Sequence, residues 1–226
     1  LFKNIMYVGA LSALLDIDVP AIETLIGEQY KGKEKLLKPN LEALHLGRDW
    51  ALGNLPCPIG LRVRKADAVG NRIFVEGNAA TALGCVYGGA TVCAWYPITP
   101  SSSVAEAFQK YCQKYRTGSD GQTRYAMIQA EDEIASVGIV VGAGWNGARA
   151  FTATSGPGVS LMNEFIGLAY FAEIPVTIID VQRGGPSTGM PTRTQQSDIL
   201  AAAYASHGDT KHVLLFPEDP PPSLEP

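Results

Sequence analysis

Hydroxyl, carboxylate and guanidinium side chains occur in this 226-residue chain at points where an apolar run gives way to a helix-like run. The first point is residues 96–103, YPITPSSS, which follow the apolar run 90–95. Pro97 and Pro100 restrict the backbone on either side of Thr99, so a small hydroxyl is presented at a rigid corner. An ordinary helix start, with Pro100 in the first turn and serines on the free N–H groups, also explains this stretch.

A second point of this kind carries three acids in a row, Glu131-Asp132-Glu133. Acidic residues at a helix start complement the positive end of the helix, and most of them do nothing else. A carboxylate held in a partly buried crevice can instead act on a bound ligand. On the residues alone, both interpretations stay open.

Two further loops follow apolar runs. Arg183 comes directly after the run 177–182, and the Gly- and Pro-rich loop that follows it is conformationally constrained. A guanidinium with a hydroxyl nearby matches a carboxylate well, so Thr99 and Arg183 are candidates for binding one. Residues 154–158, TSGPG, form a compact turn whose N–H groups either cradle an anion or simply cap a helix.

A G-x-G-x-x-G pattern at residues 142–147 is a poor candidate for dinucleotide binding. Such a site needs a strand before the glycines and a helix after them. Here the preceding residues have a helical pattern and residues 149–154 have a strand pattern, so the order is inverted. We therefore expect these glycines to let the helix pack closely and then to end it.

The loops need a framework that brings them together. A helix-like run at 78–88 is followed by expected strands and alternating helices, which predict an α/β fold with a parallel sheet flanked by helices. Right-handed crossovers then place the loops after the strands at one edge of the sheet. The expected strands are 91–95, 125–130, 149–154, 175–182 and 211–216, and the expected helices are 101–115, 132–147, 157–172 and 195–205.

Residues 1–52 have the pattern of a separate helical segment. An apolar stripe runs from Met6 to Leu15, Asp18 caps a second helix, and a third runs from Asn40 towards Trp50, with a charged loop at 31–38. Residues 53–72 have the composition of a linker. Because the chain begins with Leu inside a helix-like run and ends in FPEDPPPSLEP, we expect a fragment of a longer polypeptide.

Bulk composition argues against several classes of function. The formal charge of −4 gives no basic surface for nucleic acid, and no apolar run reaches membrane-spanning length. The four cysteines form no C-x-x-C pair and the three histidines are dispersed, so we expect no metal or iron–sulfur site within this chain. Reduced cysteines and the lack of a secretory pattern favour a cytoplasmic location.

Taken together, these motifs resemble the α subunit of the 2-oxoacid:ferredoxin oxidoreductases, which are thiamine diphosphate enzymes. The matching stretches are YPITPSSS, the Q-x-E pattern at 129–131, TSGPG, and QRGGPSTG at 182–189. The resemblance implies the thiamine diphosphate-binding fold, with residues 73–226 as its pyrimidine-binding domain. Residues 1–52 then correspond to the end of a γ-type domain fused ahead of it.

The resemblance also implies roles for individual residues. Glu131 protonates the aminopyrimidine ring of the cofactor, so that its exocyclic amine can act as a base. Thr99 and Arg183 hold the substrate carboxylate. Met190 and Arg193, in a flap at 184–196, are candidates for contacts with substrate or coenzyme A. The residues expected beside the thiamine ring are Pro97, Ile98, Ser155 and Gly156.

The implied reaction is oxidative decarboxylation of a 2-oxo acid with coenzyme A, giving an acyl-CoA, carbon dioxide and reduced ferredoxin. This chain has no G-D-G…N pattern for magnesium and diphosphate and no cluster cysteines, so a β subunit is expected to supply these groups. The QRGGPSTG form favours 2-oxoglutarate as substrate. A pyruvate- or branched-chain-specific member, another thiamine diphosphate enzyme and a non-catalytic structural subunit are the alternatives.

Overall fold

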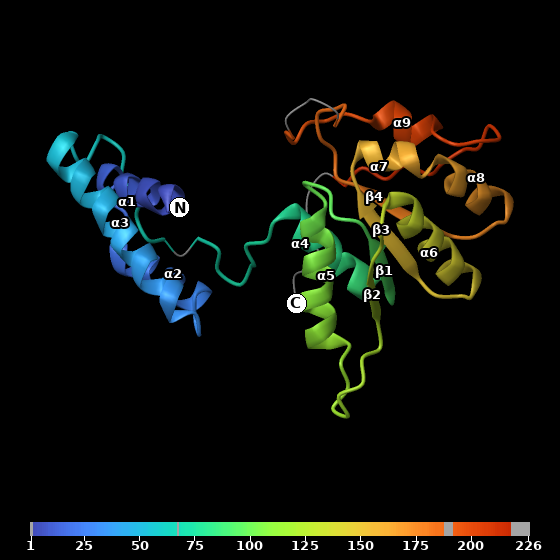
Figure 1. The fold of residues 1–226 in the computed structure, drawn as a ribbon, viewed down its shortest axis with the longest axis horizontal. Coiled ribbons are helices and arrows are strands. Elements are labelled where there is room, and N and C mark those ends of the chain that lie inside the picture. The colour runs from blue at the N-terminus through green and yellow to red at the C-terminus, as the bar shows by residue number, and fades with distance from the viewer. Residues whose placement is uncertain (1, 67, 188–191, 218–226) are drawn as a thin grey trace. The chain divides into compact units, whose positions relative to one another are not determined.

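A computed structural model of the chain describes residues 2–66, 68–187 and 192–217. The chain divides into two compact units, residues 1–70 and 71–226, and each is described by itself. The first unit consists of three helices, α1 (Lys3–Leu14), α2 (Val19–Gln29) and α3 (Glu34–Asn54) (Figure 1). In the described residues, no helix has the length and apolar character needed to cross a membrane.

The helical unit differs from the sequence expectation in three details. The charged stretch at 31–38 was expected to be a loop, but α3 begins at Glu34, because residues 34–38 continue the helical pattern of the apolar residues after them. Asp18 precedes α2, yet its side chain makes no capping hydrogen bond. Part of the segment expected to be a linker is tied to α1, since the Ile59 and Val63 N–H groups donate to Leu14 and Leu15.

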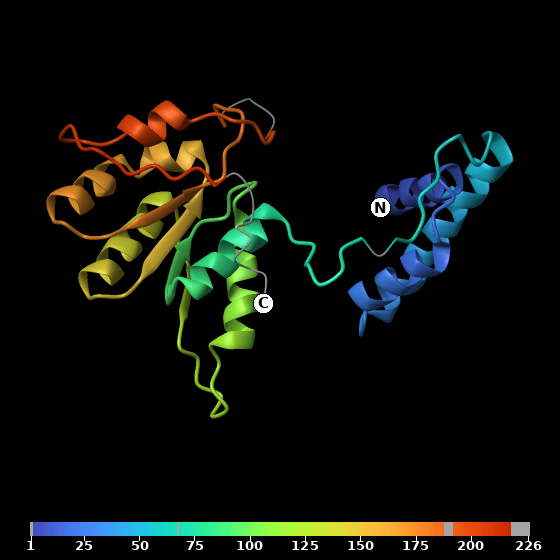
Figure 2. The ribbon, with the colours of Figure 1, turned by 180° about the vertical axis from the view of Figure 1, so that it is seen from behind.

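The second unit is a four-stranded parallel sheet with helices on both faces, as the sequence predicts. Its strands are β1 (Val92–Trp95), β2 (Ala126–Gln129), β3 (Ala150–Thr154) and β4 (Thr177–Asp180), in the order β2-β1-β3-β4. Figure 2 shows these strands from the reverse side. The helices are α4 (Gly77–Tyr87), α5 (Ser102–Tyr115), α6 (Glu133–Trp145), α7 (Gly156–Leu161), α8 (Asn163–Phe171) and α9 (Ile199–Tyr204).

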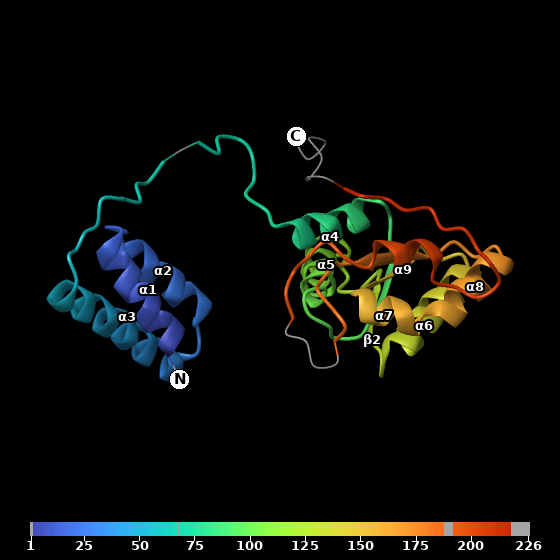
Figure 3. The same cartoon turned by 90° about the horizontal axis from the view of Figure 1, so that it is seen from above.

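Two apolar layers cover the two faces of this sheet. Neighbouring side chains of a strand point to opposite faces, so Cys93 packs with Phe108 of α5, whereas Ala94 packs with Val140 of α6. The ring of Phe108 meets that of Phe151 on β3 edge to face, with centroids 4.9 Å apart. Seen from above, α4 and α5 lie on one side of the sheet and α6, α7 and α8 on the other (Figure 3).

Three expectations for the later part of the chain differ from the structure. Residues 211–216 do not form a strand; Val213 and Leu215 are exposed, and the segment is held instead by the His212 ring, which contacts the Ala202 carbonyl of α9 at 2.8 Å. The helix expected at 157–172 is broken at Met162, whose fully buried side chain packs with Val137 and Val141 of α6 and Ala169 of α8. The helix expected at 195–205 is shorter than expected, because only α9 (Ile199–Tyr204) forms there.

The glycine pattern at 142–147 behaves as expected. It ends α6, with Asn146 as the C-terminal cap residue and Gly147 at a φ of 84° that favours glycine. Gly144 lies where a Cβ would stand 3.0 Å from both Ile174 and the Pro175 carbonyl oxygen, so glycine permits this close packing. A strand, β3, follows rather than precedes the glycines, which excludes the dinucleotide arrangement here.

Candidate functional site

The predicted site residues follow four adjacent strands, at the carboxyl edge of the sheet. Glu131 comes after β2, the 96–101 corner after β1, Ser155 after β3 and Arg183 after β4. The Ala130 N–H donates to the Trp95 carbonyl at 2.8 Å, which joins the ends of β2 and β1. The order of strands reverses between β1 and β3, and ligands of open α/β sheets bind at such a reversal.

The corner between β1 and α5 is held by its own serines. The Ser101 hydroxyl donates to the Ile98 carbonyl oxygen at 2.9 Å, and the Ser102 hydroxyl accepts from the Ile98 N–H at 3.1 Å. The Ser101 and Ser102 N–H groups also donate to the Ile98 carbonyl. The Ser101 and Ser102 side chains therefore stabilise the corner by binding the backbone of Ile98, rather than by capping the free N–H groups of α5.

The structure brings Thr99, Arg183 and Ser155 together. Arg183 Nη1 donates to the carbonyl oxygen of Thr99 at 2.7 Å, and the Ser155 hydroxyl donates to the same oxygen at 3.5 Å. These contacts come from β4 and β3, across 84 and 56 residues of sequence. They use the backbone of Thr99, so its side chain stays exposed with its hydroxyl at the edge.

Arg183 is enclosed by the start and end of the loop that follows it. Only 6% of the residue is exposed, and its Nε atom is buried without a hydrogen-bond partner in the described part of the chain. The Gly184 N–H donates to Arg193 at 2.7 Å, and Arg183 pairs with Thr194 in an antiparallel bridge. The loop is thus closed at its base, while Met190 lies outside the described residues. Arg193 is exposed.

The three acids after β2 occupy three different environments. Glu131 is exposed, and in the described residues its side chain has no hydrogen bond or ion pair, so the partly buried crevice expected for it is not present in this chain alone. Asp132 caps α6, since its Oδ1 accepts from the Ala135 N–H at 2.6 Å. Glu133 is the buried acid, 8% exposed, and its Cγ lies beside Gly158.

A pair of aspartates beside the α7 turn was not found by the sequence analysis. Both carboxylate oxygens of Asp180 are buried without a partner in the described residues, and burial, together with the nearby Asp198, raises its pKa to about 6. Asp198 accepts from the Ser197 hydroxyl at 2.9 Å. A Cβ on Gly156 would lie within 2.4 Å of the Asp198 carboxyl, so a larger residue there would require the Asp198 side chain to shift. The only signal in the sequence is an aspartate that ends an apolar strand.

Cysteines and histidines do not form a metal site in the described residues. Cys93 and Cys112 are fully buried, and burial raises the pKa of the half-buried Cys85 thiol to about 11. His45 Nε2 lies 2.8 Å from Glu23 Oε1. These side chains contribute to packing and surface pairing rather than to a cluster with chemical function.

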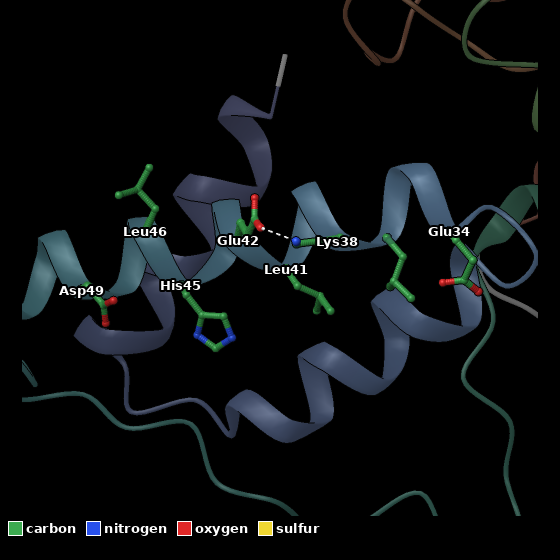
Figure 4. Close-up of a pocket in the computed structure, with 8 residues that line it drawn as sticks. Glu34, Lys38, Leu41, Glu42, His45, Leu46 and Asp49 are labelled. Atoms are coloured by element: carbon green, nitrogen blue, oxygen red, sulfur yellow. Dashed lines mark ion pairs between the residues drawn. The ribbon is translucent and has the colours of Figure 1, made fainter.

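A groove on the helical unit is separate from the sheet edge. It has a volume of about 560 Å³, and Leu37, Leu41 and His45 of α3 line it (Figure 4). Lys38 Nζ and Glu42 Oε1 pair along the same helix at 3.8 Å. None of the candidate site residues lines this groove.

Comparison with known proteins assigns the second unit to a family. A family model described as pyruvate flavodoxin/ferredoxin oxidoreductase, thiamine diP-bdg, matches residues 83–221. The α subunit of 2-oxoacid:ferredoxin oxidoreductase 2 from Aeropyrum pernix is 39% identical over 226 residues, covering 96% of this chain and 35% of that protein. The 2-oxoglutarate synthase subunit KorA from Methanocaldococcus jannaschii is 47% identical over 144 residues, covering 64% of this chain and 37% of that protein.

A solved structure has the same fold. The 2-oxoglutarate:ferredoxin oxidoreductase from Magnetococcus marinus, with 2-oxoglutarate, coenzyme A and succinyl-CoA bound, matches with a TM-score of 0.67 and 38% sequence identity. The match covers 92% of this chain and 35% of that chain. The present chain therefore spans about a third of the length of the relatives it matches.

Proposed function

Because the chain belongs to the thiamine diphosphate-binding family of the pyruvate flavodoxin/ferredoxin oxidoreductases, we propose that it is the pyrimidine-binding part of an α subunit of a 2-oxoacid:ferredoxin oxidoreductase. The complete enzyme oxidatively decarboxylates a 2-oxo acid with coenzyme A to an acyl-CoA, carbon dioxide and reduced ferredoxin. The observation that carries this proposal is the convergence of Thr99, Ser155 and Arg183 at the strand-order reversal of a domain from this family.

The described residues fit thiamine diphosphate in the chemistry they offer. Bound thiamine diphosphate supplies the carbanion chemistry that cleaves the bond between a ketone and a neighbouring carboxylate. Glu131 holds a proton at the aminopyrimidine ring nitrogen. Its exposed carboxylate, which has no partner among the described residues, is available to a ring that a second chain encloses.

Thr99 and Arg183 bind the substrate carboxylate in this proposal. Thr99 is exposed at the sheet edge, and the buried Arg183 guanidinium donates to the Thr99 carbonyl. The guanidinium thus fixes the Thr99 peptide and also brings a positive charge to the corner, which favours an anion. Pro97, Ile98, Ser155 and Gly156 shape the surface on which the thiamine ring rests.

The remaining parts of the site belong to other chains in this proposal. A β subunit supplies the diphosphate site, the magnesium ion and the iron–sulfur clusters, and ferredoxin accepts the electrons from the complex. We favour 2-oxoglutarate as substrate, because 2-oxoglutarate is named for the Methanocaldococcus relative and bound in the Magnetococcus structure.

Turnover by the assembled enzyme tests this function. The full-length subunit, co-expressed with the partner encoded beside it, is assayed by viologen dye reduction with coenzyme A and either 2-oxoglutarate, pyruvate or a branched-chain 2-oxo acid. We expect 2-oxoglutarate to give the highest kcat/KM. Thr99→Val should raise the KM about 10-fold, as the loss of one hydrogen bond to a charged group implies.

Thr99→Ser is the matched control, because it keeps the hydroxyl and should leave the KM within about threefold of the original value. Preference for pyruvate or a branched-chain acid would correct the substrate but keep the reaction. Lack of turnover with every 2-oxo acid, in a complex with its cofactors bound, would refute the proposal.

A further inference from the structure

We infer that Asn78 is a positioning residue for Thr99, an inference that rests on the proposed function. Asn78 lies in the first turn of α4, outside the four loops that form the candidate site. Its side-chain amide donates to the Pro100 carbonyl oxygen at 3.0 Å and to the Ser103 hydroxyl at 2.7 Å. These two contacts bridge the end of the corner and the first turn of α5.

The three successive carbonyls of the corner are held by three different parts of the chain. The Ile98 carbonyl accepts from the serines that begin α5. The Thr99 carbonyl accepts from Arg183 of the β4 loop and from Ser155. The Pro100 carbonyl accepts from Asn78 of α4. Asn78 therefore holds the Pro100–Ser101 peptide, on the C-terminal side of Thr99.

Few other hydrogen-bond donors among the described residues reach the Pro100 carbonyl oxygen. The Val104 N–H, which would reach it in a regular α-helix, donates instead to Ser101 at 2.9 Å. The Ser103 hydroxyl reaches the Pro100 carbonyl only at 3.5 Å, close to the limit for a hydrogen bond. With Asn78 removed, the carbonyl of the Pro100–Ser101 peptide loses its shortest side-chain contact.

The chemistry of an amide suits this position. Asn78 has two N–H donors on one nitrogen, and its two contacts can use both of them. An aspartate has the same shape but offers acceptors only, so it can accept from the Ser103 hydroxyl but cannot donate to the Pro100 carbonyl. Asn78→Asp therefore removes the hydrogen bond to the Pro100 carbonyl of the corner, while a hydrogen bond with the Ser103 hydroxyl of α5 can remain.

Kinetics of the full-length subunit with its β partner test this role. Asn78→Ala and Asn78→Asp should each raise the KM for the 2-oxo acid about 10-fold, because a small misplacement of a binding group has a large effect. The kcat should fall less than about threefold, because Glu131 follows a different strand and has no contact with Asn78. Ser103→Ala should change the KM less than either variant, since it leaves the shorter contact of Asn78 with the Pro100 carbonyl intact.

Thr81→Val is the matched control on the same helix. Within the described residues the Thr81 hydroxyl bonds only to the Gly77 carbonyl of α4, at 2.8 Å, so the KM of this variant should not change. Hydrogen exchange of the Ser101, Ser102 and Val104 amides provides a second readout that does not depend on turnover. It should become faster in Asn78→Ala and Asn78→Asp and stay unchanged in Thr81→Val.

The outcomes are distinguishable. An unchanged KM with unchanged exchange would overturn the inference. A large fall in kcat and in melting temperature alongside the rise in KM would also overturn it, because that combination indicates a general structural role. If the original complex turns over no 2-oxo acid, the proposed function fails, and the exchange measurement alone decides whether Asn78 holds the corner.

Discussion

Asp180 is a carboxylic acid at a position that disfavours its charge. It ends β4 opposite Thr154 of β3, and both of its carboxylate oxygens are buried without a partner in the described residues. Burial is the larger cause of its raised pKa, and the like charge of Asp198 is the smaller one. The folded protein therefore holds a proton on Asp180 more tightly than the unfolded chain does.

This shift predicts how stability depends on pH. The pKa rises from 3.8 to about 6 on folding, so the stabilisation is complete below the lower value and is lost as pH rises through the higher one. Asp180→Asn, which is neutral throughout, should make the melting temperature less dependent on pH across this range. Thermal unfolding at several pH values measures it, with the exposed Asp49→Asn as control. Equal pH dependence in Asp180→Asn and the original protein would contradict this prediction.

At the scale of elements, the closest contact is between α1 and α3. The two helices meet at reciprocal glycines: a Cβ on Gly9 would lie 2.0 Å from the Leu44 carbonyl oxygen, and one on Gly47 would lie 1.9 Å from that of Met6. Both neighbours are backbone atoms, which cannot rotate away. The crossing of these helices therefore depends on glycine at both positions.

Gly47→Ala should accordingly separate the two helices. We expect a loss of about 3 kcal/mol in the stability of the helical unit, typical of an overpacked contact that the backbone must relieve. Hydrogen exchange of peptides from α1 and α3 measures the change. Gly27→Ala on α2, where a Cβ meets nothing within 4 Å, is the control and should be neutral or slightly stabilising. Unchanged exchange in Gly47→Ala would show that the helices can shift without cost.

Helices and strands were predictable from the sequence where a local pattern of residues specifies them. The strands β1 to β4 and the helices α5 and α6 have the expected order, because apolar periodicity and glycine or proline boundaries mark them. The expected strand at 211–216 failed because a strand needs a neighbour, and apolar residues such as Val213 do not specify one. The Met162 side chain at the break is buried against α6 and α8, and the sequence of 157–172 does not encode contacts with α6.

The candidate site was predictable in its residues more than in its contacts. Motif resemblance identified Thr99 and Arg183 as a pair, and the structure joins them, but through the Thr99 carbonyl rather than its hydroxyl. Asn78 was missed because its partners lie 22 and 25 residues away and its motif has no chemical signature. Asp180 was missed because its neighbour Asp198 follows the flap at 184–196, and the sequence does not show that this later segment lies beside β4.

At the scale of the whole molecule, the proposed function gives this chain only one part of a shared site. It spans about a third of its relatives, and Glu131 is exposed at the edge strand β2. Water competes with any ligand for the hydrogen bonds of an exposed carboxylate. Its proposed role therefore requires a second chain that covers this edge and excludes water.

The full-length subunit should consequently be inactive by itself and active with its β partner. In the assembled enzyme, Glu131→Gln should lower kcat about 100- to 10,000-fold, the range that a positioned acid contributes. Glu133→Gln, two residues away and packed beside Gly158, is the control and should reduce kcat far less. Dye reduction with the 2-oxo acid measures activity, and size-exclusion chromatography verifies assembly. Turnover by the subunit without a partner, or full activity of Glu131→Gln, would refute a shared site.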